Sequence, residues 1–294
     1  LSPKEFPHLT GLKGRTLLTS DGTTILGADD KAGIAEILTM IERIQTENRP
    51  HGMICVAFTP DEEIGMGAEH FNLDQFGAEY AYTLDGDSEG EIQYENFNAC
   101  KAEFEIRGFN VHPGEGKDTM INASLVAIEI NNCLPSMETP RGTEDYEGFY
   151  HLISMQGEVG EAKLNYIVRD HDKNGFEERK KTLRLIEKNL NAKWGEGTVT
   201  LKITDQYLNM KEIVEEHMHL IDHAKKACEA AGVAPLILPI RGGTDGCQLS
   251  FKGLPCPNLG TGGHAFHGPY EHISVEGMEK SVELLLALIQ EYTK

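Results

Sequence analysis

The sequence predicts an α/β protein in which a smaller βαββαβ domain interrupts a larger domain. Near both ends of the chain, short apolar runs bounded by Gly, Pro or Asp alternate with segments of helical periodicity, a pattern typical of a sheet covered by helices. In the middle, strands that alternate apolar and charged residues dominate, as half-exposed strands do. We therefore expect a discontinuous large domain at residues 1–97 and 209–294, and an inserted domain at 98–208.

Apolar spacing places the elements of the large domain. A helix begins just after Asp29, because apolar residues recur at helical spacing from Ile34 to Ile44. The other elements expected here are strands at residues 52–60, 80–87 and 234–240, a long helix at 210–232 ended by Gly232, and a closing amphipathic helix at 274–294.

The inserted domain is expected to have the split-βαβ, or ferredoxin-like, order. Its predicted elements are strands at residues 101–108, 149–157, 162–170 and 198–205, with helices at 122–134 and 175–194. A cleft between two domains is a usual place for an active site.

Composition excludes several classes of partner. The 294 residues carry 27 Lys and Arg against 47 Asp and Glu, a formal charge of −20, which argues against nucleic acids and anionic membrane surfaces. No apolar run is long enough to span a bilayer, and the first residues do not resemble a signal peptide. The six cysteines are scattered without a C-x-x-C pair, so we expect free thiols and a cytoplasmic protein.

Acidic residues gather where predicted strands end. The clusters are "GADDKAG" (Asp29, Asp30), "TPDEEIG" (Asp61, Glu62, Glu63) and "TLDGDSEG" (Asp85, Asp87, Glu89). The carboxyl ends of strands form the ligand-binding edge of an open α/β sheet. A Gly-rich loop, "LGTGGHAFHGPYEHIS", adds three histidines: His264, His267 and His272. Any one cluster is more often a solvated turn. Together they favour a site for divalent zinc, cobalt or manganese.

At these residues the chain resembles a known family. The motifs "GADDKAG", "FTPDEEIG", "TLDGD", "VHPG", "IRGGTDG" and "FHGPYE" occur in the order found in the di-zinc peptidases of the aminoacylase and carboxypeptidase superfamily. The resemblance implies a zinc-peptidase-like α/β catalytic domain with an inserted lid or dimerisation domain. It also implies a metallo-exopeptidase that removes the N-terminal residue from tripeptides by means of a water held between two zinc ions.

The resemblance assigns roles in the large domain residue by residue. Asp29 would bridge the two metals, Glu63 and His267 would be metal ligands, and Asp85 would bind one of the metals. Glu62 would be the general base that activates the bridging water.

The resemblance also assigns roles in and beside the inserted domain. His112 would polarise the scissile carbonyl, and Arg169, Asn209 and Arg241 would bind the peptide, the arginines through its carboxylate. Taken without the resemblance, His112 is a surface turn, Arg169 a surface ion pair and Arg241 an ordinary loop charge. Closing the inserted domain would bring His112 and Arg169 to the metals, from the same chain or from a homodimer partner.

One family motif has no counterpart in the printed sequence. The family carries an H-x-D motif, whose His binds zinc, upstream of the position of Asp29, and only His8 precedes Asp29 here. We therefore expect either a fragment of an active enzyme or a naturally short form, with one ligand lacking and activity reduced. Two alternatives stay open: a related di-zinc amidase, such as a deacylase or carboxypeptidase, and a non-catalytic oligomerisation module.

Overall fold

The computed structural model describes residues 1–293 and divides them into two compact units. The first unit contains Leu1–Glu95, Met210–Ile240 and the residues from Thr244 onward, and the second contains Asn96–Asn209 with Arg241–Gly243. Arg241–Gly243 thus belongs to the second unit, although the sequence-based division placed it in the large domain. No helix within the described residues is long and apolar enough to cross a membrane.

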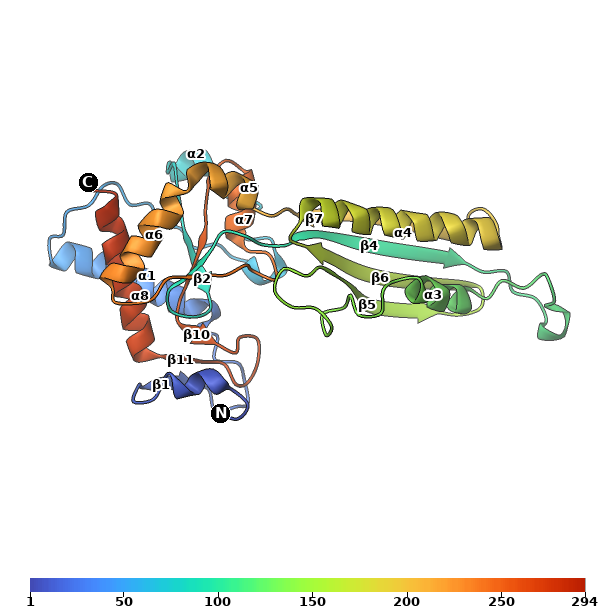
Figure 1. Cartoon of the computed structure of the whole chain (residues 1–294), viewed down its shortest axis with the longest axis horizontal. Coiled ribbons are helices and arrows are strands. Elements are labelled where there is room, and N and C mark those ends of the chain that lie inside the picture. The colour runs from blue at the N-terminus through green and yellow to red at the C-terminus, as the bar shows by residue number, and fades with distance from the viewer. Residues whose placement is uncertain (294) are drawn as a thin grey trace. The chain divides into compact units, whose positions relative to one another are not determined.

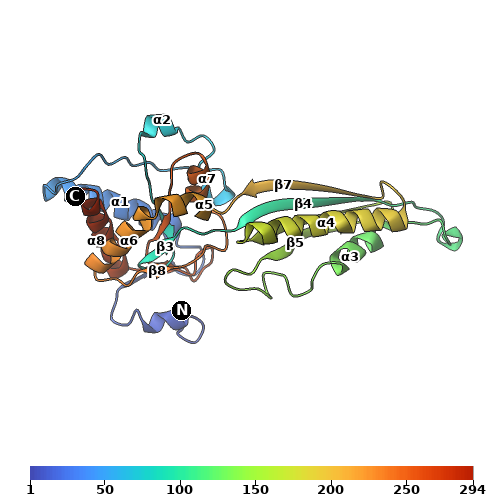
Figure 2. The same cartoon turned by 45° about the horizontal axis from the view of Figure 1, so that its top comes forward.

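The first unit contains two small sheets and the helices around them (Figures 1 and 2). Its strands are β1 (Leu17–Thr19), β2 (Thr83–Gly86), β3 (Glu91–Gln93), β8 (Leu236–Ile237), β9 (Asn258–Gly260), β10 (Gly263–His264) and β11 (His272–Ser274). Its α-helices are α1 (Ala28–Thr46), α2 (Leu73–Phe76), α5 (Lys211–Val214), α6 (His219–Ala230), α7 (Asp245–Phe251) and α8 (Val275–Glu291). Short 3₁₀ turns are η1 (Pro7–Thr10), η2 (Glu62–Ile64) and η4 (Glu215–His217).

The two sheets differ in strand direction. One is antiparallel with the order β1-β11-β10, and the other has the order β2-β9-β3-β8, in which β2 runs parallel to β9. Helix α8 packs against both α1 and α6. Its start is capped by the Ser274 side chain, which accepts the Gly277 N–H, and its apolar stripe includes the buried Leu284 and Leu288.

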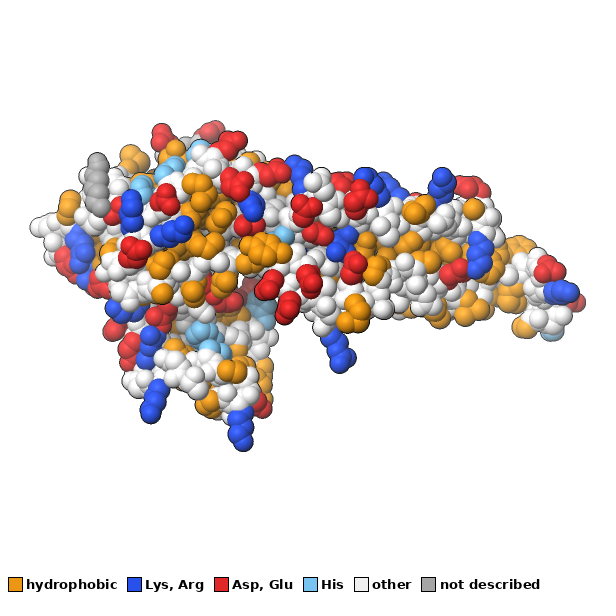
Figure 3. All heavy atoms as spheres, viewed as in Figure 1, with side chains coloured by type: hydrophobic (Ala, Val, Ile, Leu, Met, Phe, Trp, Pro, Cys, Tyr) orange, Lys and Arg blue, Asp and Glu red, His pale blue; other side chains and the backbone are white. Residues whose placement is uncertain are grey.

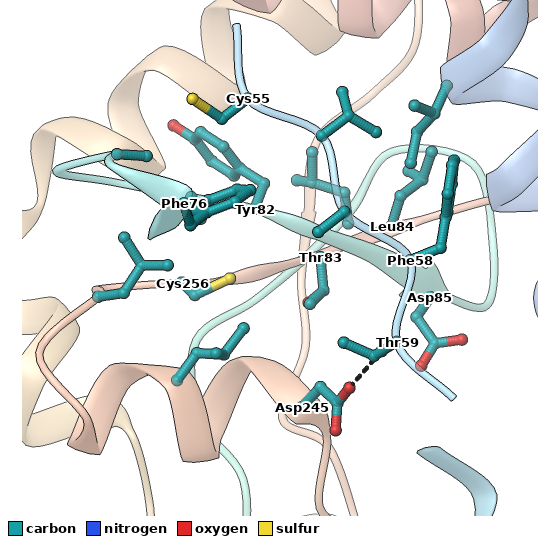
Figure 4. Close-up of a pocket in the computed structure, with 18 of the residues that line it drawn as sticks. Cys55, Phe58, Thr59, Phe76, Tyr82, Thr83, Leu84, Asp85, Asp245 and Cys256 are labelled. Carbon is teal, nitrogen blue, oxygen red and sulfur yellow. Dashed lines mark hydrogen bonds between the residues drawn. The ribbon is translucent and has the colours of Figure 1, made fainter. Parts of the chain in front are cut away.

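The strand expected at residues 52–60 is absent, which corrects the prediction. The segment has no helix or strand, and Met53 is 89% exposed. A cavity of about 810 Å³ is lined by this segment on one side and by β2, the edge strand of its sheet, on another. Figure 4 shows Cys55 and Phe58 of the segment and Leu84 of β2 around this space. A strand requires a backbone partner for its N–H and C=O groups, and apolar composition alone does not supply one.

The single helix expected at 210–232 is also wrong in part. It is two helices, α5 and α6, separated by the 3₁₀ turn η4, and Gly232 follows α6 in the left-handed conformation as expected. Val214 and Leu220 are both buried. Six residues make about one and two-thirds turns of an α-helix and would place these two on different faces. The tighter 3₁₀ turn rotates more per residue and brings both toward the buried side.

The second unit is a four-stranded antiparallel sheet with two helices on it. Its elements are β4 (Asn98–Arg107), α3 (Ala123–Asn132), β5 (Phe149–Gly157), β6 (Glu161–Asp170), α4 (Lys173–Trp194) and β7 (Val199–Tyr207), with a 3₁₀ turn η3 (Pro113–Glu115). The strand order is β5-β6-β4-β7, and the chain order is the βαββαβ order expected from the sequence. Alternating residues of β4 and β6, such as Phe104 and Leu164, are buried with α3 and α4 in one core.

Candidate metal centre

Asp29 stands at the start of α1, on a backbone that is not helical. Its φ and ψ are −79° and 106°, and the Asp29–Asp30 peptide is cis. Gly33, one turn further on, has no side chain to separate α1 from the Leu84 carbonyl of β2. This close approach places the acidic start of α1 beside Asp85, the third residue of β2.

His267 lies in the loop between β10 and β11. Its φ is +61°, and Ala265 in the same loop has φ +56°. Positive φ is uncommon for residues other than glycine and concentrates at functional sites. The His267 Nε2 lies 2.9 Å from Asp29 Oδ2, and this contact joins two segments that are 238 residues apart in sequence.

Glu63 completes the group from a third segment. It follows Asp61, which has φ +63°, and lies in η2. Its Oε2 is 3.3 Å from His267 Nε2, and one ligand atom from each of Asp29, Glu63 and His267 lies within 4.8 Å of the other two. Two carboxylates and an imidazole form a donor set suited to zinc, cobalt or manganese, so these residues fit a divalent metal. Among the described residues this is the single group of three or more such side chains found close enough to hold an ion.

Asp85 is not a member of that close group, but its charge is coupled to it. Burial, followed by the negative charges of Asp30 and Glu62, raises the pKa of Asp85 to about 9. Its backbone N–H donates to Asn258 Oδ1 at 3.1 Å, which fixes this end of β2 against β9. Burial likewise raises the pKa of Asp30 to about 8, with a contribution from Asp29.

Glu62, beside Glu63 in η2, has a different environment from its neighbour. Burial raises the pKa of Glu62 to about 7, and the next largest contribution is the charge of Asp245. The site therefore concentrates carboxylates whose ionisation burial opposes, and a divalent cation would relieve that penalty.

Asp245 was not predicted as a site residue. It begins α7, is almost fully buried, and accepts a hydrogen bond from Thr59 Oγ1 at 2.7 Å (Figure 4). Its Oδ1 has no hydrogen-bond partner among the described residues. The motif "IRGGTDG" contains Asp245, but the sequence does not indicate that this aspartate is buried next to the acidic cluster. Asp30 was noted only as a member of its cluster.

All three predicted substrate-binding residues lie at one end of the second unit's sheet. Arg169 is on β6 opposite Ala99 of β4, and Asn209 follows β7. Arg241 lies over the rings of Phe97 and Phe149, with its Cζ 5.1 and 5.8 Å from the ring centroids.

Each of these three side chains is held by hydrogen bonds within the second unit. Arg169 is buried, donates to the carbonyls of Cys100 and Val168, and stacks over Tyr207, so it is not the surface ion pair that the residue alone suggests. Arg241 donates to the carbonyls of residues 143, 145 and 147. The Asn209 amide donates to the His171 carbonyl and accepts from the Asn96 N–H.

His112 lies beyond the opposite end of the same sheet. It is exposed in the loop after β4, and its Nδ1 accepts the Gly114 N–H at 3.2 Å. Ten residues of β4 separate the two ends of the sheet, a length of about 30 Å. His112 and Arg169 of one chain are therefore not brought together.

Comparison with known proteins agrees with this fold and shows the family. The model of Peptidase family M20/M25/M40 matches residues 22–291. Peptidase T of Halothermothrix orenii is 55% identical over 293 residues, which cover 99% of this chain and 72% of that protein. Peptidase T of Clostridium perfringens is 56% identical and is covered to 73%. The crystal structure of aminopeptidase PepT from Bacillus cereus superposes with a TM-score of 0.83 at 28% identity, covering 95% of this chain and 74% of that one.

An α/β unit that collects carboxylates and a histidine at strand and helix ends, together with this match, defines the class: the chain belongs to Peptidase family M20/M25/M40. Within that family it groups with the peptidase T proteins, which are more than half identical to it over nearly its whole length. The chain spans about 72% of the length of those relatives.

Proposed function

We propose that this chain carries the catalytic residues of a metal-dependent aminopeptidase that removes the N-terminal residue from tripeptides. The observation that carries the proposal is the convergence of Asp29, Glu63 and His267 from three distant segments, with ligand atoms within 4.8 Å of one another. The names and identities of the peptidase T relatives support the substrate class.

The metal ligands are proposed from this geometry and from the donor chemistry. Glu63 and His267 would hold one ion, Asp85 would hold the other, and Asp29 would be shared between them. Bound zinc, or cobalt or manganese in its place, would supply Lewis acidity toward water and the scissile carbonyl. A dinuclear metal-binding peptidase of the M20 family from Bacillus subtilis has the same fold, with a TM-score of 0.65 at 16% identity.

Glu62 is the proposed general base. Its neighbour Glu63 lies at the metal group, whereas the half-buried Glu62 is influenced most by Asp245 among its charged neighbours. Adjacent side chains of a 3₁₀ turn point in different directions, so one can bind metal while the other accepts the proton of the attacking water.

Substrate binding is proposed for Arg169, Asn209 and Arg241. The guanidinium groups are already fixed by backbone carbonyls, so little side-chain entropy is lost when they bind the peptide carboxylate. A clamp at a fixed distance from the metals would select very short peptides.

His112 is proposed to act from a second copy of the chain. A site that uses both His112 and Arg169 cannot take both from one chain, because the length of β4 separates them. A homodimer is further supported by β5, which is an edge strand with Ile153 and Met155 exposed, and by the exposed Leu125 and Ile128 of α3. Figure 3 shows hydrophobic side chains gathered over α3 and the neighbouring strands.

Metal content and hydrolysis measured on the same dialysed sample test the proposal. Tripeptides and N-acyl amino acids are assayed side by side, and we expect metal binding with a preference for tripeptides. Faster hydrolysis of N-acyl amino acids would make the chain a related amidase. Stable self-association with neither metal nor hydrolysis would make it a non-catalytic module.

Mixing two inactive variants tests the role of His112. His112→Ala and Asp29→Ala each remove a different site residue, so a heterodimer of the two would rebuild one complete site. We expect activity to recover when the two variants are mixed. If the mixture stays inactive, His112 either has no part in the mechanism or acts in the site of its own subunit.

A further inference from the structure

Glu271 is a buried carboxylate in the loop that also carries His267. It is 1% exposed, and its Oε2 accepts the Gly27 N–H at 2.6 Å while its Oε1 accepts the Asp29 N–H at 3.0 Å. Its own N–H donates to the Gly268 carbonyl at 3.2 Å. Both oxygens are thus used on the backbone that leads into α1.

The two amides that Glu271 binds need an acceptor from outside their helix. The first N–H groups of a helix have no intrahelical carbonyl to bond. Gly27, which precedes α1, has φ +71° and provides no side-chain cap. A carboxylate is the strongest acceptor for such amides, because the bonds are charge-assisted and the helix start carries partial positive charge.

These two hydrogen bonds link two of the proposed metal ligands through the backbone. The first ligand is Asp29, whose own N–H donates to Glu271. The second is His267, which the loop of residues 265–271 presents to Asp29. Within the described residues, the loop and the backbone of residues 27–29 are joined by the two hydrogen bonds of Glu271, in addition to the contact between the His267 and Asp29 side chains.

We propose that Glu271 is a positioning residue of the metal centre: it sets the separation between Asp29 and His267 by binding the backbone of the first and belonging to the loop of the second. The inference rests on the proposed function, since it assumes that these two residues bind metal. It assigns Glu271 no contact with metal or substrate.

The geometry requires a carboxylate rather than an amide. Two oxygens each accept one N–H, and glutamine has a single oxygen. In Glu271→Gln one backbone amide would face an NH₂ group and be left without an acceptor in a buried place. Glu271→Asp keeps the charge but shortens the side chain, so it reaches the two amides less well.

Glu276 is a matched control. It also accepts a backbone amide with both oxygens, the Thr16 N–H at 3.1 and 2.8 Å, and it also lies next to β11. Thr16, to which Glu276 is bonded, directly precedes β1 and is not next to a proposed metal ligand. Glu276→Gln therefore makes the same chemical change in the same unit without touching the ligand group, and its remaining oxygen can still accept the one Thr16 N–H.

The experiment measures Co²⁺ binding to the full chain, by visible absorption and by competition with a chelator. We expect Glu271→Gln to weaken Co²⁺ binding about 10–100-fold, as loss of an outer-shell partner does. Glu271→Asp should give a smaller loss, and Glu276→Gln should bind as the unchanged chain does. Co²⁺ affinity within twofold of the unchanged chain in Glu271→Gln, or an equal loss in Glu276→Gln, would overturn the proposal.

Amide hydrogen exchange of the metal-free chain separates this inference from the proposed function. In Glu271→Gln we expect faster exchange in residues 26–30 and 264–270, whereas in Glu276→Gln any change in exchange should be confined to the surroundings of residue 16. If the chain without substitutions binds no Co²⁺, the proposed metal site is wrong. The role of Glu271 then depends on hydrogen exchange alone, and unaltered exchange in those two segments of Glu271→Gln would overturn that role. If Glu271→Gln does not fold, Glu271→Asp decides on the same two readouts.

Discussion

The two units of this chain differ in how completely their sheets are paired. In the second unit, four strands of nine or ten residues form one antiparallel sheet with a single core. In the first unit, strands of two to four residues form two sheets, and an apolar segment lines a cavity of about 810 Å³ beside an edge strand.

The second unit is thus distinguished by its apolar packing, and the first by its acidic side chains. The second unit buries its apolar residues in a continuous core, so it has the features of an independently stable body. The first unit contains the buried Glu36 and the half-buried Asp30 and Asp85, whose charge opposes folding unless a cation is bound. We therefore expect the first unit to respond to metal and pH, and the second unit to respond to core substitutions.

The largest effect is expected from His267→Ala on metal binding. Loss of an imidazole ligand should lower Co²⁺ affinity by more than the roughly 10–100-fold typical of an outer-shell change. His151→Ala, on β5 of the second unit, serves as the control and should leave affinity unchanged. Chelator competition measures both. Equal affinities in the two variants would remove His267 from the metal centre.

Truncation of a core side chain should destabilise the second unit more than the first. Leu164 is fully buried in the second unit's core, and Leu164→Ala should lower that unit's free energy of unfolding by roughly 2–5 kcal/mol, because it leaves a new cavity. Leu84 of β2 lines the existing cavity, so Leu84→Ala mainly loses transfer free energy, roughly 1–2 kcal/mol.

Hydrogen exchange resolved by unit measures both variants, because a single unfolding transition cannot be assumed for two units. A larger loss in Leu84→Ala than in Leu164→Ala would mean that the space beside β2 is closed in solution, and the contrast between the units would fail.

Sequence patterns predicted the second unit better for a physical reason. Alternation along β4 and β6 reflects a sheet with one buried face, and each strand finds its partner within the same stretch of chain. The apolar run at 52–60 carries an equally strong signal, yet it has no strand partner among the described residues. An apolar pattern indicates that a segment can be buried, but it does not supply the partner strand or the neighbours that bury it.

The site was predicted from the sequence to the extent that its residues carry motifs. Asp29, Glu63 and His267 lie in motifs of the family and are gathered by the fold. Glu271 and Asp245 were missed because only the fold shows that they are buried beside the other residues, which adjacent sequence does not encode.

A smaller effect is expected from pH on the metal-free chain. Burial, and then the charge of Asp30, raises the pKa of Glu36 to about 10, whereas the ordinary value is about 4.3. A raised carboxyl pKa means that the folded state binds the extra proton, so stability is fully present below about pH 4 and is lost as pH rises toward 10. Hydrogen exchange in the first unit should show falling stability from pH 5.5 to 8, and Glu36→Gln should reduce this fall, leaving the part that comes from Asp30, Glu62 and Asp85.

In the second unit the dependence of stability on pH should have the opposite sign. The hydrogen bond from Lys193 lowers the pKa of Glu129. The stability that this pair contributes is therefore present above the ordinary pKa of Glu and is lost only as pH falls below it. The second unit should therefore be insensitive between pH 5.5 and 8. A parallel fall in both units, or an unchanged slope in Glu36→Gln, would contradict the assignment to Glu36.

The smallest effects are expected from one tyrosine hydroxyl in each unit. In the first unit, Tyr82 donates to the Leu220 carbonyl and therefore must accept from Tyr292, whose oxygen lies 2.8 Å away. In the second, Tyr166 donates to Asn131 Oδ1 at 3.0 Å. Tyr292→Phe and Tyr166→Phe each remove one donor but leave an acceptor that water or another donor can reach, so each should cost about 0.5–1.5 kcal/mol of its own unit's stability.

Equal small losses, measured by hydrogen exchange, would mean that the units differ in apolar packing and buried charge rather than in hydrogen bonding. A loss well above that range in Tyr292→Phe alone would mean that the first unit depends on this hydrogen bond to join α8 to the segment before β2.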